Sequence, residues 1–133
     1  MRLWHQELIP YLSRQHLLGQ HRECAALRGA GWGRKHSTVD YVFNYDPSYL
    51  VAYHYLIMDE MEKRGYHPDP IWRNADYRGK VLGTQLGWAG TETAKAIAQD
   101  TTHNIFLEHD NNYLQECLKN LKDKGFEINY ENS

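Results

Sequence analysis

The sequence DPSYLVAYHYLIMDEMEKRG, residues 46–65, carries both the start and the stop signals of one long helix. Asp46 can cap the helix with its side-chain oxygen, and Pro47 suits the first turn because the N–H it lacks would have no partner there. Apolar side chains then recur at the spacing of a helix face. Basic residues in the last turn precede Gly65, which can adopt the left-handed conformation that ends helices. We therefore predict a helix that follows Asp46 and stops at Gly65.

Three further helices are predicted on either side of this segment. The first should run from about Pro10 to Leu27, with proline tolerated in its first turn and Gly29 as its stop. A short helix is expected over residues 91–98, and a last one over residues 112–124, which ends with the same basic-glycine-aromatic signal as the central helix.

Two long connections separate these helices. Residues 29–36 and 66–90 are rich in glycine and proline, which disfavours regular helix. Residues 36–43 alternate in the manner of a strand, but a single strand would have no partner. The predicted fold class is therefore all-α, a single compact helical bundle with long irregular connections.

Length and composition favour one domain over residues 1–133, expected to be a monomer. The longest apolar stretches fall well short of a membrane span, and the first residues carry no export signal, so we expect a cytoplasmic protein without a membrane partner. Cys24 and Cys117 are too few for a disulfide framework and are predicted to be free thiols.

Charge is distributed unevenly along the chain, whose formal net charge is −2. Residues 1–36 contain six Lys and Arg against two Glu, whereas residues 37–133 contain nine Lys and Arg against fifteen Asp and Glu. Nucleic-acid binding normally leaves a basic footprint. Any surface that faces DNA is therefore expected largely in the first third, although ordinary unevenness of solvated charge would give a similar pattern.

Three short motifs read QHLLGQHRE at residues 15–23, KHSTVDYVF at 35–43 and DYRG at 76–79. The first resembles the signature helix of the pyrimidine-dimer DNA glycosylases, the phage endonuclease V type, and the others resemble later elements of that family. The resemblance covers roughly residues 8–80 and implies an all-helical repair glycosylase that acts on damaged pyrimidines. Residues 81–133 show no match and form a divergent C-terminal part, without a counterpart of the family's aromatic tail.

The resemblance also implies chemistry at the start of the chain. The family attacks deoxyribose C1′ with its terminal α-amine and forms a Schiff base that can lead to strand loss, so Met1 is the candidate nucleophile. An ordinary α-amine is about 10–20% free base at neutral pH, and a lysine only about 0.04%. Arg2 favours the neutral amine, yet removal of Met1 generally requires a small second residue. Either the Met1 amine is the nucleophile, or the chemistry has changed to simple base removal or to another reaction.

Glu23 corresponds to the family's catalytic carboxylate, which would stabilise positive charge on the sugar and assist proton transfer. His16 lies two turns earlier on the same helical face, with Gly19 between them. This spacing leaves a hollow that the start of the chain or a sugar could enter. In the alternative interpretation, Gly19 allows close helix packing and His16 is a hydrogen-bonded structural residue.

The candidate DNA contacts are cationic or aromatic. Arg22 matches a family arginine that contacts phosphates; Arg34 and its neighbours extend this edge, and Arg28 is a weaker member. Trp32, between two glycines, could enter a base stack, or it could be a lid over the core. The predicted DNA-binding set is Arg2, His16, Arg22, Trp32, Arg34, Lys35 and His36.

Other chemistries lack support in the sequence. The histidines near Glu23 do not form a His-Glu-x-x-His zinc motif, and there is no phosphate-binding loop, so no metal and no cofactor are expected. The expected partner is double-stranded DNA that contains a damaged base. Arg2, the acidic latter part and the missing tail leave an alternative, a non-catalytic DNA-binding or interaction module on the same scaffold. A protein-interaction domain without DNA affinity is a third interpretation.

Overall fold

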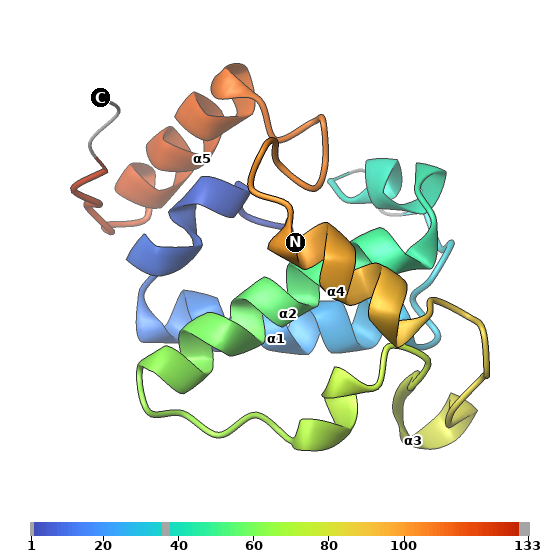
Figure 1. The fold of residues 1–133 in the computed structure, drawn as a ribbon. Coiled ribbons are helices and arrows are strands. Elements are labelled where there is room, and N and C mark those ends of the chain that lie inside the picture. Colours follow the sequence, from blue (N-terminus) through green and yellow to red (C-terminus); the bar gives the residue numbers. More distant parts are fainter. Residues whose placement is uncertain (1, 36–37, 131–133) are drawn as a thin grey trace.

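The computed structural model describes residues 2–35 and 38–130 (Figure 1). Within these ranges the regular structure is helical, apart from one isolated bridge between Tyr77 and Thr84. The α-helices are α1 (Arg14–Arg28), α2 (Pro47–Lys63), α3 (Gly79–Leu82), α4 (Thr91–Gln99) and α5 (Asn111–Asp123), and the 3₁₀ helices are η1 (Gln6–Tyr11), η2 (Asp40–Asn44) and η3 (Pro70–Arg73). The all-α prediction is confirmed, and the strand considered for residues 36–43 is instead the 3₁₀ helix η2 over most of its described part.

The central helix is α2, which packs between α1 and α4 (Figure 1). One side of α2, with Leu50, Tyr53 and Ile57, joins the main core with α1, and the other side, with Val51 and Met58, packs on Ala94 of α4. Burial on both sides explains why this segment is apolar almost all round. Within the described ranges, no helix has the length and apolar character needed to cross a membrane.

Both ends of α2 follow the sequence signals. Asp46 accepts a hydrogen bond from the Ser48 N–H at 2.9 Å, and Gly65 has a positive φ of 86°. The Tyr66 N–H then donates to the Met61 carbonyl at 2.8 Å, and the equivalent Phe126 N–H donates to Leu121 at 2.9 Å after α5. The predicted starts and stops of these two helices are confirmed.

The first long helix starts later than predicted. It begins at Arg14, because Ser13 accepts a hydrogen bond from the His16 N–H at 3.2 Å and so caps the helix. Leu12 is extended, with ψ of 144°, and Pro10 lies in the separate 3₁₀ helix η1. The prediction of one continuous helix from Pro10 was wrong because it placed the start at proline and overlooked the serine cap.

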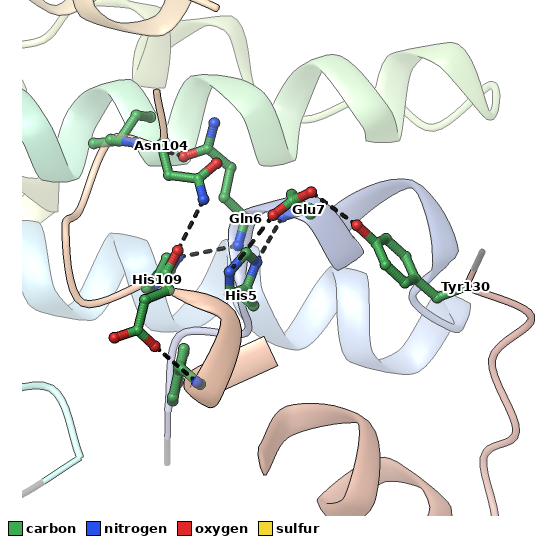
Figure 2. A network of polar contacts seen from close by, with 9 residues as sticks. His5, Gln6, Glu7, Asn104, His109 and Tyr130 are labelled. Atoms are coloured by element: carbon green, nitrogen blue, oxygen red, sulfur yellow. Dashed lines mark hydrogen bonds and ion pairs between the residues drawn. The ribbon is translucent and has the colours of Figure 1, made fainter. Parts of the chain in front are cut away.

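The C-terminal part fixes the beginning of the chain through a buried polar network (Figure 2). His109 Nδ1 accepts the Gln6 N–H at 3.0 Å, and the Gln6 side chain accepts the Ile105 N–H at 2.7 Å. The Tyr113 hydroxyl of α5 donates to the Leu3 carbonyl at 2.5 Å. Residues far apart in sequence therefore hold residues 3–6 against α1 and α2.

Acid is expected to unfold the protein partly through His109. Burial lowers the pKa of His109 from 6.5 to about 3. Between these pH values His109 is protonated in the unfolded state but neutral in the folded state. The free energy of unfolding therefore falls as the pH drops from about 6.5 toward 3. His109→Gln should flatten this dependence by about 1.4 kcal/mol per pH unit. Urea unfolding from pH 7 to pH 4.5 measures the slope, with the exposed His67→Gln as control, and equal slopes in wild type and His109→Gln would contradict the prediction.

Candidate active site and DNA interface

Gln20 of α1 holds the start of the chain against the helix. Its side-chain Nε2 donates to the Arg2 carbonyl at 2.9 Å, and its Oε1 accepts the Trp4 N–H at 2.9 Å. The buried Tyr53 hydroxyl of α2 lies 2.9 Å from the same Oε1 and 2.6 Å from the Trp4 carbonyl. This bidentate clamp fixes the backbone of residues 2–4 on one face of α1.

Glu23 lies on the same face as the clamp. His16, Gly19, Gln20 and Glu23 follow the three- and four-residue spacing of one helix face. The Trp4 ring meets the His16 ring with centroids 5.5 Å apart, whereas the Arg2 backbone is tied one turn further along, at Gln20. The backbones of Arg2 and Trp4 are thus both held at Gln20, about one turn of α1 before Glu23. Met1 itself lies outside the described residues.

The Glu23 side chain is half-buried and available for chemistry. It makes no hydrogen bond or ion pair with any residue in the ranges 2–35 and 38–130. A carboxylate without an internal partner has its acceptor oxygens available for a ligand. This distinguishes Glu23 from Glu60, which is paired with Arg64 at 2.8 Å.

A cavity of about 370 Å³ opens beside this face. The space at Gly19 is open, because the nearest atom to an added Cβ would be Arg22 Nη2 at 3.8 Å. The cavity lies beside His16 and Gly19, as the spacing suggested, but Glu23 is not among its lining residues. The lining residues are Arg2, Trp4, Gln15, His16, Gly19, Gln20, Thr38, Asn120 and Lys124.

His16 forms a fixed wall of this cavity. Its Nδ1 lies 2.9 Å from Ser13 Oγ, and its ring meets Phe126 edge-on with centroids 4.5 Å apart. Burial, and then the nearby Lys124 charge, lower the pKa of His16. A neutral ring held in this way can line a nucleotide site while adding no charge to it.

The predicted cationic residues fall into different environments. Arg22, Arg34 and Lys35 are exposed, and among the described residues none of them has a carboxylate partner. Arg2 is engaged instead, paired with Glu116 at 2.8 Å and stacked 5.6 Å from the centroid of the Trp4 ring. His36 lies outside the described ranges.

Two aromatic or basic candidates lie inward. Trp32 packs edge-on against Phe43 and Trp88, with centroid distances of 5.0 and 5.5 Å, as a lid over the core would. Arg28, the weaker phosphate candidate, is fully buried and donates to backbone carbonyls. The suggestion that Arg28 contacts phosphate was wrong, because a side chain with no exposed surface cannot reach DNA.

Sequence reasoning missed Gln20, Asn120 and Lys124 as parts of the site. Gln20 lies in the recognised motif, but its role depends on backbone atoms that fold onto it. Asn120 and Lys124 belong to the end of α5, and α5 reaches the cavity only through the tertiary fold. No local signal in the sequence could have found this pair.

Comparison with known proteins identifies the class. A family model described as pyrimidine dimer DNA glycosylase matches residues 1–74, more than half of the chain. The chain belongs to this family of DNA glycosylases. Searches of curated proteins and of solved structures found no match.

The matched region contains α1, α2 and the first two sequence motifs, including Glu23 and the Gln20 clamp. It ends before Asp76, so the third motif lies outside it. Helices α4 and α5 also lie outside, together with the Asn120 and Lys124 wall of the cavity.

Proposed function

We propose that this protein removes damaged pyrimidines, in particular pyrimidine dimers, from duplex DNA, with the amino group at the start of the chain as nucleophile and Glu23 as the catalytic carboxylate. The observation that carries the proposal is the Gln20 clamp, which holds the Arg2 and Trp4 backbone on the face of α1 that carries Glu23. Family membership supports the glycosylase activity and its DNA substrate.

The proposed reaction begins with the uncharged amine. Its nitrogen forms a bond to C1′ of the deoxyribose while the bond from C1′ to the pyrimidine breaks, and the base departs with the bonding electrons and takes up a proton. The Glu23 carboxylate stabilises the positive charge that develops at C1′. Loss of the amine proton and opening of the sugar ring then give a Schiff base between the nitrogen and C1′.

An abasic-site lyase step follows from this intermediate. The imine acidifies the 2′ hydrogen, and removal of that proton breaks the bond between C3′ and its oxygen, so that the 3′ phosphate leaves. In this proposal the Glu23 carboxylate exchanges these protons. Arg22, Arg34 and Lys35 supply an exposed cationic edge for the phosphates on either side of the damaged nucleotide.

Borohydride trapping on an abasic duplex tests the nucleophile. Reduction of the Schiff base should yield a stable covalent adduct, and peptide mapping should locate the oligonucleotide on the amino-terminal residue. Mass spectrometry of the mature terminus identifies that residue beforehand. Lys35→Gln is the control, because it should still be trapped at the same nitrogen.

Blocking the α-amine by acetylation should abolish the adduct. An adduct that maps to a lysine, or one that survives acetylation, would overturn the terminal-amine mechanism. DNA binding without trapping or base release would instead indicate the non-catalytic binding module.

A further inference from the structure

The loop between the third sequence motif and α4 presents an apolar tip to solvent. Val81 is 94% exposed, Leu86 is 92% exposed and Leu82 is 38% exposed. Figure 1 shows α3 and the loop after it at the end of the molecule opposite α5. All three lie within six residues of one another in the chain, and apolar side chains that gather on a surface mark contact sites when they form a continuous patch.

Hydrogen bonds to the Asp76 side chain hold the loop that carries the tip. Asp76 accepts backbone N–H groups from Gly87, Ala89 and Gly90, each at 2.9 Å. These hydrogen bonds lower the pKa of the Asp76 carboxyl, which stays ionised and fixes the part of the loop that leads back to α4. The exposed side chains therefore project from a preorganised support.

Arg78 ties this support to the end of α1. Its guanidinium lies 4.3 Å from the centroid of the Trp88 ring and donates to the Arg28 carbonyl at 2.8 Å and the Gly29 carbonyl at 3.1 Å. Trp88 also meets Trp32 of the loop that follows α1. The tip thus lies beside the loop that carries Arg34 and Lys35.

The charged side chains of the tip segment itself are basic, and the acidic Asp76 and Glu92 flank this segment in the sequence. Residues 77–91 contain Arg78 and Lys80 but no Asp or Glu, and residues 24–39 likewise contain basic residues but no Asp or Glu. The rest of the chain is predominantly acidic. An apolar tip with an exposed cationic rim complements duplex DNA, in which phosphates flank an apolar base stack.

We propose that Val81 and Leu86 form a wedge that enters duplex DNA beside the damaged nucleotide, while Lys80, Arg34 and Lys35 hold the flanking phosphates. This inference rests on the proposed function, because the amine has to reach C1′ of a nucleotide inside duplex DNA, and opening the stack beside that nucleotide gives access to its sugar. An α-helix rises about 7.5 Å from Glu23 to Arg28, which is about two base steps. Arg78, at the start of the tip segment, contacts the Arg28 and Gly29 carbonyls at this end of α1.

The double variant V81S/L86S tests the wedge. Both side chains are almost fully exposed, so the thermal unfolding midpoint should match that of the wild type. Affinity for a duplex with one abasic site should fall by about tenfold to a hundredfold, which corresponds to partial burial of two apolar side chains. Leu107→Ser is the matched control, because Leu107 is 76% exposed beside Glu108 in the acidic part, and it should bind this duplex as the wild type does.

Unstacking provides a readout that altered surface charge would not move. A 2-aminopurine base next to the abasic site should brighten when the wild type or Leu107→Ser binds, and should brighten much less with saturating V81S/L86S. Borohydride trapping on a single-stranded abasic oligonucleotide should be equal for all three proteins, because no duplex has to be opened.

Three outcomes would overturn the wedge. The first is a V81S/L86S variant whose duplex affinity and 2-aminopurine fluorescence match those of the wild type. If that variant were still trapped normally, the wedge would be wrong and the proposed function would stand. Equal losses on single-stranded and duplex DNA would indicate damage to the site. Failure of the wild type to bind or be trapped on either substrate would reject the proposed function and the wedge together.

Discussion

Glu23→Gln is expected to lower the rate at which the bond between C1′ and the pyrimidine is cleaved in a pyrimidine-dimer duplex by about a hundredfold to ten-thousandfold, the range typical for loss of a positioned acid–base group. Glutamine keeps the shape of the side chain but supplies no negative charge opposite the sugar and cannot exchange a proton. Because the transition state gains positive charge at C1′, the loss should fall on the rate of the bound complex and leave affinity for the duplex nearly unchanged.

Single-turnover rates with saturating enzyme measure this effect directly. Glu92→Gln is the control, because Glu92 is an exposed carboxylate of α4 whose nearest cation is 3.9 Å away. The Glu23 side chain has no hydrogen bond or ion pair within residues 2–35 and 38–130, so its variant should unfold at the wild-type temperature. A variant that folds and binds normally and still releases base at the wild-type rate would remove Glu23 from the mechanism.

The helices were predictable where their signals are local. Asp46 and Gly65 act on backbone groups within a few residues, so the bounds of α2 could be read from the sequence. The start of α1 was misjudged because Pro10 and Ser13 both suit a helix beginning, and only the extended Leu12 decides between them.

The site was predictable only in part for the same reason. Glu23, Gly19 and His16 share one helix face by spacing alone, so their common edge followed from the sequence. The clamp by Gln20 needs the first residues to fold back onto α1, and Lys124 reaches the cavity only when α5 packs there. Such long-range contacts leave no periodic signal in the chain.

Arg28 illustrates this limit, because a basic residue at a helix end is typical of a solvated or phosphate-binding side chain, yet it is fully buried here. Its Nη1 donates to the Trp72 carbonyl at 2.9 Å, and its Nη2 donates to the carbonyls of Asn74 and Tyr77 at 2.8 and 2.9 Å. The guanidinium therefore fastens the irregular segment after α2 onto the end of α1.

The same guanidinium fixes the protonation of a buried histidine. Arg28 Nη1 lies 3.0 Å from His54 Nδ1, and because arginine can only donate, this Nδ1 carries no proton. The proton of the neutral ring is then on Nε2, which donates to His21 Nδ1 at 2.7 Å. Burial, followed by the Arg28 charge, holds the pKa of His54 well below its usual value.

Arg28→Met should therefore cost about 3–5 kcal/mol of unfolding free energy, since it leaves buried carbonyls and His54 Nδ1 without donors. Burial lowers the pKa of Arg28 only to about 10, so the wild-type group is charged at neutral pH and its charge-assisted bonds are all lost. Arg28→Lys should recover only a small part of the lost unfolding free energy. A single ammonium cannot reach all the carbonyls to which the two guanidinium nitrogens donate. Urea unfolding at pH 7 measures the loss, and Arg22→Met, exposed on the same helix, should stay within about 0.5 kcal/mol of wild type. A loss below about 1 kcal/mol in Arg28→Met would mean that the segment is held by its apolar contacts and that the guanidinium is dispensable.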